Sequence, residues 1–113
     1  MAKHTQRALF PGAVEMMVLQ ILKPEGLHGY ALAQEIQRSS NNLIRIQGGT
    51  LYQALQRLRK ARLVKAEWGV SSTNRRVRIY KLTAAGKKHV AHEVSRFERM
   101  LEGITHLLAS RKT

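Results

Sequence analysis

The chain has 113 residues, 20 lysines and arginines against 7 aspartates and glutamates, no cysteine, and a formal net charge of +13. This length suits one compact domain with one protruding element, and no apolar run approaches the ~20 residues of a transmembrane helix. Thiol catalysis and cysteine-ligated zinc fingers are excluded. Because the N-terminus lacks the apolar core of a secretory signal, we expect a cytoplasmic protein, and its excess charge favours a polyanionic partner.

Two short helices and a brief strand are predicted in the first part of the chain. Apolar residues recur at helical spacing from Gly12 to Leu22, and residues 23–26 (Lys-Pro-Glu-Gly) end that pattern. A second helix is predicted from Gly29 to Arg38, before the polar residues 39–42. Residues 43–46 (Leu-Ile-Arg-Ile) favour a brief strand.

A third helix is predicted from Leu51 to Ala61, after a turn that contains two glycines and Thr50. Its apolar face consists of Leu51, Ala54, Leu55 and Leu58. The opposite face carries Gln53, Gln56, Arg57 and Lys60, with Tyr52 and Arg59 at its flanks. Core packing does not require an exposed face so rich in glutamine, arginine and lysine.

A hairpin is predicted next, with strands at residues 63–68 and 77–82 and a polar tip at 69–74. Trp68 and Tyr80 are expected to be core residues that brace it. Arg75, Arg76 and Arg78 follow the tip, and this pattern favours contact with phosphates.

Thr83 is expected to cap a long last helix from Ala84 towards Ala109. Apolar residues recur along it with alternating spacings of four and three, which is a heptad seam: Val90, Val94, Phe97, Leu101, Ile104 and Leu108. Such a seam packs either on its own domain or on a second copy. Phe97 has two interpretations: plain core packing, or a gap at a dimer axis that accepts a flat ligand.

The third helix has the parts that a helix needs to read the major groove. Gln53 and Gln56 suit adenine edges, Arg57 suits guanine, and Thr50, Arg59 and Lys60 suit phosphates. The alternative for each residue is an ordinary solvated position. His89 and His92 lack a third ligand at matching spacing, and no nucleophile lies beside a base, so neither a metal site nor an enzyme is expected.

Four words of the sequence follow one another in a characteristic order: HGYALAQEI at 28–36, GGTLYQALQRL at 48–58, LVKAEWG at 63–69 and NRRVRIYKLTAAGKK at 74–88. In this order and spacing they resemble the PadR-type transcriptional regulators, a winged helix-turn-helix family, over about residues 9–108. The AEWG and NRR words and the single C-terminal helix are most similar to the short branch first described from acidobacteria.

The resemblance implies a homodimeric repressor whose C-terminal helices cross and whose third helices enter successive major grooves of a near-palindromic operator. It implies that the wings touch the DNA backbone and that Tyr52 and the basic residues after it contact DNA. In some members, small aromatic or multidrug-like compounds act as inducers. Three residues depart from the family pattern: Gln53 stands where proline is usual, Gly49 where this branch often has an acid, and Phe97 where several short members carry tryptophan.

The predicted fold is mainly α with a small β-hairpin: a winged helix-turn-helix DNA-binding domain at 9–83 and a dimerisation helix at 84–110. The predicted partners are double-stranded DNA, a second copy and a small aromatic or drug-like effector bound near Phe97, with no cofactor and no membrane. The predicted DNA-binding residues are Thr50, Tyr52, Gln53, Gln56, Arg57, Arg59, Lys60, Arg75, Arg76 and Arg78. Two rivals remain: a non-specific nucleic-acid packaging or RNA-associated protein, and a protein-interaction module that uses the last helix.

Overall fold

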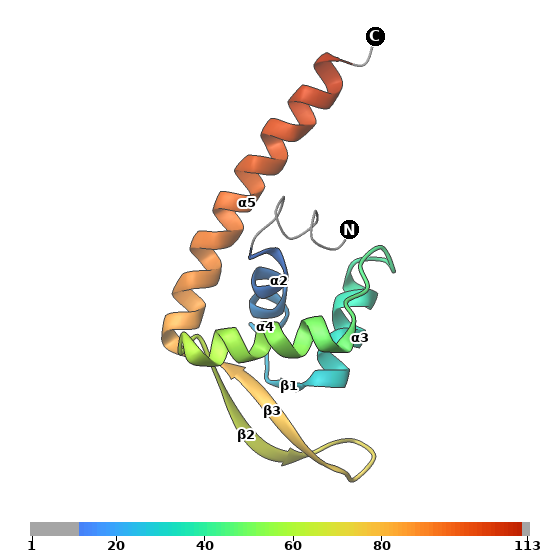
Figure 1. Ribbon diagram of the computed structural model, residues 1–113, viewed down its shortest axis with the longest axis vertical. Coiled ribbons are helices and arrows are strands. Elements are labelled where there is room, and N and C mark those ends of the chain that lie inside the picture. The colour runs from blue at the N-terminus through green and yellow to red at the C-terminus, as the bar shows by residue number, and fades with distance from the viewer. Residues whose placement is uncertain (1–11, 112–113) are drawn as a thin grey trace.

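The computed structural model describes residues 12–111. In chain order the elements are α2 (Ala13–Ile21), β1 (Leu27–His28), α3 (Gly29–Ser39), α4 (Gly48–Lys60), β2 (Val64–Val70), β3 (Arg76–Leu82) and α5 (Ala84–Ser110). The hairpin of β2 and β3, called the wing below, projects from one end of the helical core, and α5 starts beside the base of the wing and extends past the opposite end of the core (Figure 1). The predicted winged helix-turn-helix fold with a long last helix is confirmed. The predicted domain start at residue 9 lies outside the described residues.

The core forms where α2, α3 and α4 meet the base of the wing and the start of α5. All four residues of the predicted apolar face of α4 are buried. The other buried hydrophobic residues are Val18, Leu19, Leu22, Leu32, Ile36, Val64, Tyr80 and Val90. Each fully buried aliphatic side chain contributes about 1.5–3 kcal/mol, so this cluster holds α4 and the wing in one fixed relation.

The strand predicted at residues 43–46 is wrong, because this segment pairs with no strand. It satisfies backbone groups locally instead: the Leu43 and Ile44 N–H groups donate to the Ser40 carbonyl and Oγ at 3.1 and 3.0 Å. The third strand is β1, which pairs antiparallel with β3 and gives the order β1-β3-β2. Helix α4 begins at Gly48, before the predicted Leu51, with Gln47 as its N-cap residue.

The wing is a regular antiparallel hairpin whose register runs from Val64 opposite Leu82 to Val70 opposite Arg76. At its tip, the Ser71 N–H donates to the Arg75 carbonyl at 2.8 Å, and the Asn74 N–H donates to the Ser71 carbonyl at 2.9 Å. Asn74 has a φ of 63°, a left-handed conformation that asparagine tolerates better than most residues. The arginines that follow the tip therefore start from a defined turn.

Helix α5 has 27 residues, and only its first part packs on the core. Val90 is 1% exposed, whereas Leu101 and Leu108 are 44% and 70% exposed. The second half extends past the other helices (Figure 1) and gives a molecule of 56 × 27 × 25 Å. Within residues 12–111, no helix is long and apolar enough to cross a membrane.

Candidate nucleic-acid interface

Helix α4 presents a polar and basic face on the side away from the core. Six of the residues predicted to bind DNA are exposed on it and one, Gln56, is half-buried; the six are Thr50, Tyr52, Gln53, Arg57, Arg59 and Lys60. The half-buried Gln56 accepts a hydrogen bond from Arg59 at 3.5 Å, the outer limit of such a bond. Gln53 and Lys60 lie opposite the buried Leu51 and Leu58 on the helix, which is the position that meets a groove.

Arg57 is held by a carboxylate of another helix. Its Nε donates to an oxygen of Glu15 in α2, and the Arg57 and Glu15 side chains are 52% and 23% exposed. The sequence interpretation gave Arg57 a guanine edge, whereas in the free protein its guanidinium faces α2. Arg57 therefore has to leave this ion pair before it can contact a base.

This ion pair leads to a prediction for Glu15→Gln. Removing the carboxylate charge frees Arg57 to bind a phosphate as well as the guanine edge that the sequence suggested. We therefore expect tighter binding to every duplex and a salt dependence steeper by about 0.9 in log–log slope, which corresponds to one added phosphate contact. Stability should change by less than about 1 kcal/mol, because exposed ion pairs contribute little. Glu102→Gln makes the same charge change on α5 and is the control. Equal slopes for the two variants would show that Arg57 is not restrained by Glu15.

The tip half of the wing carries an aromatic and cationic face. Trp68 pairs in register with Arg78, and Arg76 lies diagonally across on the same face. The Arg76 and Arg78 guanidinium carbons lie 4.3 and 5.1 Å from the centroid of the Trp68 ring, within the range of cation–π attraction. The ring therefore holds both guanidinium groups near it.

Trp68 is not the core residue that the sequence predicted. The alternation along β2 is correct, since Val64 is buried and Ala66 is half-buried on the same face. However, the hairpin is longer than the core that it packs on, so Trp68 lies beyond the core edge and is 58% exposed. Tyr80, nearer the base of the wing, is 6% exposed, which confirms its predicted core position.

The opposite face of the wing contains Glu67, the only acid between Arg45 and Lys81. Its carboxylate lies 3.0 Å from the Lys81 ammonium and 3.6 Å from that of Lys65. The hydrogen bond from Lys81 lowers the pKa of Glu67. This acid is therefore ionised and paired on a different face from Trp68, so it does not weaken the positive charge of the arginine face.

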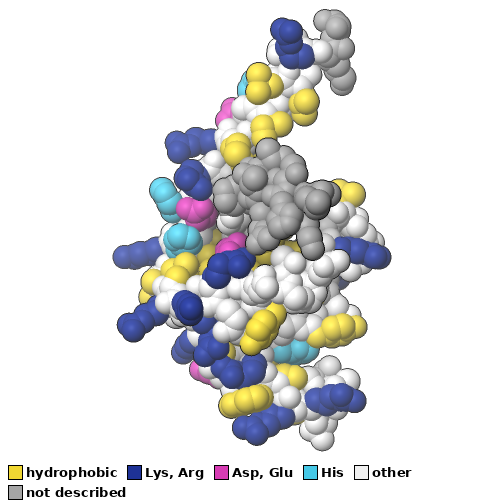
Figure 2. Space-filling model, viewed as in Figure 1, with side chains coloured by type: hydrophobic (Ala, Val, Ile, Leu, Met, Phe, Trp, Pro, Cys, Tyr) yellow, Lys and Arg dark blue, Asp and Glu magenta, His cyan; other side chains and the backbone are white. Residues whose placement is uncertain are grey.

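Positive side chains are distributed over the face seen in Figure 2, and several gather over the wing. Arg75 and Arg76 are exposed, and Arg78 is half-buried. Tyr52 of α4 and Arg76 and Arg78 of the wing line one groove, so the wing arginines lie near the start of α4. The positive electrostatic potential of these side chains attracts a phosphate backbone and raises the rate of association with it.

The predicted seam on α5 divides into two parts. Val90 packs in the core of its own chain and cannot contact a partner, which corrects its predicted dimerisation role. From Val94 onward the seam borders a groove of about 370 Å³ between α2, α3 and α5. This groove is mainly apolar; its lining includes Met16, Met17, Ile21, Ile36, Ile44, Val94, Phe97 and Leu101. Ile104 is half-buried, and Leu107 and Leu108 are 64% and 70% exposed.

Two sequence comparisons extend these observations. Residues 18–92 match the family described as Transcriptional regulator PadR-like family. An uncharacterised protein of Lysinibacillus sphaericus is 29% identical over 91 residues, which make up 80% of this chain and 84% of that protein.

Solved structures have the same fold. A transcriptional regulator from Clostridium thermocellum has a TM-score of 0.77 at 26% identity, over 88% of this chain and 96% of that one. A PadR family transcription regulator from Clostridium difficile has a TM-score of 0.72 at 24% identity, over 86% of this chain and 99% of that one. Bacillus subtilis PadR in complex with operator DNA has a TM-score of 0.64 at 17% identity, over 73% of this chain and 46% of that one. Because the last two structures are less than 25% identical to this chain, their similarity to it concerns the fold alone.

Proposed function

Since this chain belongs to the PadR-like family of transcriptional regulators, which are not enzymes, we propose that it is a cytoplasmic repressor that binds a near-palindromic DNA operator as a homodimer. The observation that carries the proposal is that Tyr52 of α4 and Arg76 and Arg78 of the wing line one groove, beside the exposed polar face of α4. In a winged helix-turn-helix the recognition helix reads the major groove while flanking cations hold phosphates.

We assign different roles to the residues of this surface. Gln53 and Gln56 read base edges from α4, while Thr50, Tyr52, Arg59 and Lys60 contact the backbone beside them. Arg75, Arg76 and Arg78 bring the wing to neighbouring phosphates. Arg57 joins the interface only after it separates from Glu15. Supporting this division, Gln53 and the wing arginines Arg75 and Arg76 are exposed.

Helix α5 is the basis for two further proposals, the domain division and the dimer. We propose that residues up to 83 form the DNA-binding domain and that residues 84–110 form the dimerisation helix. The support is the exposed apolar stripe that continues the seam beyond the core, with Leu101, Ile104 and Leu108. A second copy of α5 that covers this stripe places two recognition helices at half-site centres roughly 34 to 36 Å apart, or multiples of that spacing.

The effector proposal concerns the groove beside Phe97. Its volume of about 370 Å³ falls at the small end of the range for ligand sites, and Phe97 and Met17 line it. A small aromatic compound that enters there would alter the packing of α5 on α2 and so the separation of the two recognition helices. Phe97→Ala should abolish the response to such a compound while operator binding without it persists.

The first test is footprinting on DNA upstream of the protein's own gene, against a scrambled duplex, at ~150 mM salt. Protection of a near-palindromic site supports a specific regulator. Non-specific affinity at such salt is typically only 10⁻⁴–10⁻⁶ M. If the scrambled duplex competes equally, the packaging alternative holds instead.

With six to ten phosphate contacts, affinity should fall on the order of 10³- to 10⁵-fold between 50 and 200 mM salt.

Two substitutions separate phosphate contact from base reading. Arg76→Ala should weaken binding to all duplexes alike and flatten the salt dependence by about 0.9 in log–log slope. Gln53→Ala should instead lose discrimination at particular bases, by about 1–3 kcal/mol, with the slope unchanged. Affinities measured for a set of operator variants at several salt concentrations would distinguish the two. The same profile for both variants would contradict these role assignments.

A further inference from the structure

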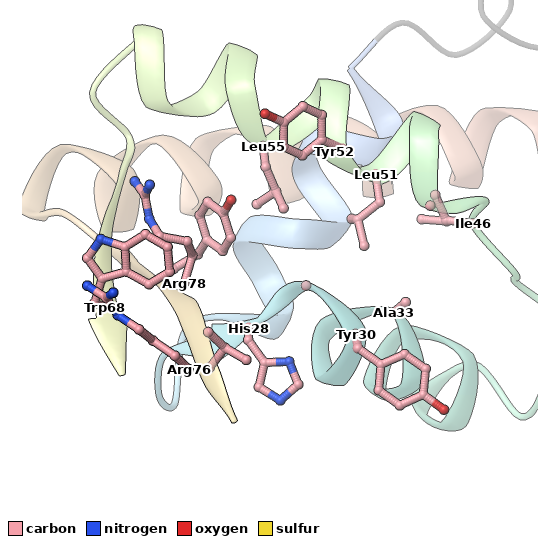
Figure 3. Close-up of a pocket in the computed structure, with 14 residues that line it drawn as sticks. His28, Tyr30, Ala33, Ile46, Leu51, Tyr52, Leu55, Trp68, Arg76 and Arg78 are labelled. Carbon is pink, nitrogen blue, oxygen red and sulfur yellow. The ribbon is translucent and has the colours of Figure 1, made fainter. Parts of the chain in front are cut away.

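A groove lies between the wing and the starts of α3 and α4, and duplex binding does not account for all of its features. Its volume is about 600 Å³, within the range of ligand sites. Four elements contribute aromatic residues to its lining: Tyr30 from α3, Tyr52 from α4, Trp68 from β2 and Tyr80 from β3. Trp68 and Tyr30 lie on opposite sides of the view in Figure 3. Arg76 and Arg78 complete its wing side, and no carboxylate is among the residues that line it.

Three of these four aromatic side chains are largely exposed. Trp68, Tyr52 and Tyr30 are 58%, 59% and 72% exposed, so none of them serves the core in the way that Tyr80 does at the floor of the groove. Large rings left in water around one groove indicate a partner that presents flat faces. The bases of an intact duplex present only their edges in the grooves, because their faces are stacked on one another.

The cations in the groove are placed for a ligand that is both flat and anionic. Arg76 and Arg78 lie against Trp68, and the planar guanidinium group is itself a stacking surface. The Nε atom of Arg78 is buried and has no hydrogen-bond acceptor within residues 12–111. Because an unpaired buried donor is costly, this atom favours a ligand that brings an acceptor such as a phosphate oxygen.

From these observations we propose that the groove binds unpaired nucleic acid: phosphates bind Arg76 and Arg78 and draw a guanidinium group off the Trp68 ring, and bases stack on that ring and on the exposed tyrosines. The combination of aromatic platforms with a positively charged groove is what sequence-tolerant single-strand binding requires. This activity goes beyond the proposed recognition of a duplex operator. Since Tyr52, Arg76 and Arg78 are shared with the duplex-binding surface, single strand and duplex compete for the protein.

Trp68 is the only tryptophan in the chain, so it reports directly on its own groove. Titration of the full chain with ten-residue oligomers of deoxythymidylate and of uridylate should quench its fluorescence, because bases stack on the ring. Excess duplex should reverse the quenching. The oligomer that binds more tightly identifies DNA or RNA as the source of the unpaired strand. An unchanged emission with both oligomers would overturn the proposal.

Substitutions test whether the rings themselves bind the strand. With a labelled oligomer and anisotropy as the readout, Trp68→Ala and Tyr30→Ala should each weaken binding roughly 5- to 150-fold, the equivalent of one lost stacked base. Val70→Ala, on the same wing but outside the groove lining, is the matched control and should change little. Binding that survives both ring substitutions unchanged is purely electrostatic and would refute the stacking site.

The two proposals fail separately. Single-strand binding that depends on Trp68 but no operator footprint would overturn the repressor and leave this inference standing. A clear footprint together with oligomer binding that ignores Trp68 and Tyr30 would do the reverse. Tyr30→Ala is the most selective variant, since Tyr30 belongs to none of the residues assigned to duplex contact.

Discussion

Leu101→Asp should leave the protein monomeric and weaken operator binding about 10²- to 10⁴-fold, the factor that a second linked half-site typically supplies. Leu101 is 44% exposed and lines the apolar groove beside Phe97, at the point where α5 leaves the core. A carboxylate placed in a helix-to-helix contact must lose its hydration without a cation to pair with, which is strongly unfavourable. Sedimentation or light scattering at micromolar concentration measures the change in mass.

The control for this substitution is His106→Asp. His106 is exposed on the opposite side of α5, and its replacement introduces the same carboxylate without touching the seam. It should leave the dimer intact and reduce DNA affinity only slightly. A Leu101→Asp variant that is monomeric yet binds the operator at full affinity would show that the exposed stripe serves another partner, as the interaction-module alternative requires.

The helical part of the fold was predictable because its apolar residues recur with the helical period. The buried face of α4 was identified residue by residue, and its end was placed within one residue, although no glycine marks it. Arg62 takes the left-handed position there, with a φ of 62°, and the Leu63 N–H closes the turn on the Leu58 carbonyl at 3.0 Å. The prediction of where α4 ends therefore rested on the periodicity of its apolar residues and not on a capping residue.

The features that the sequence did not predict depend on how the helices and strands lie relative to one another in the folded protein. The ion pair of Glu15 and Arg57 joins residues 42 positions apart, and it exists only because α2 crosses α4 at that point. The exposure of Trp68 depends on how far the wing reaches beyond the core, which the alternation along β2 does not encode. The pairing of Trp68 with Arg78 also escaped prediction, because strands at 63–68 and 77–82 would place Trp68 opposite Val77, whereas the observed register starts at Val64 and is shifted by one residue.

The start of α4 was misplaced for a local reason. Gly48 and Gly49 resemble turn residues, and glycine in a helix interior costs about 1 kcal/mol relative to alanine. In the first turn of a helix the backbone N–H groups have no acceptor within the helix, whichever residue is present. Glycine is therefore less unfavourable relative to alanine there than in the helix interior. The Leu51 N–H donates to the Gln47 carbonyl at 2.9 Å, which places both glycines inside the helix.

The joint between the DNA-binding part and α5 depends on one glycine. Thr83 caps α5: its Oγ accepts from the Gly86 N–H at 3.0 Å and donates to the Arg62 carbonyl at 2.8 Å, while the Thr83 N–H donates to the Leu63 carbonyl at 3.1 Å. A Cβ on Gly86 would lie 2.1 Å from that same Leu63 oxygen. The helix start is therefore pressed directly against the backbone that leads into the wing.

Gly86→Ala should thus destabilise the protein by about 3 kcal/mol or more, because the backbone atom that it meets cannot rotate away as a side chain can. For a domain of this size the midpoint of thermal unfolding should fall on the order of 10 to 20 °C. Gly103→Ala is the matched control on the same helix: its Cβ meets nothing within 4 Å, so alanine should stabilise the protein by about 0.5–1 kcal/mol. Calorimetry of the two variants should give shifts of opposite sign. If Gly86→Ala is as stable as the parent protein, α5 can move away from the wing. The contact at Gly86 would then not fix the spacing between the two recognition helices, on which dimeric operator recognition depends.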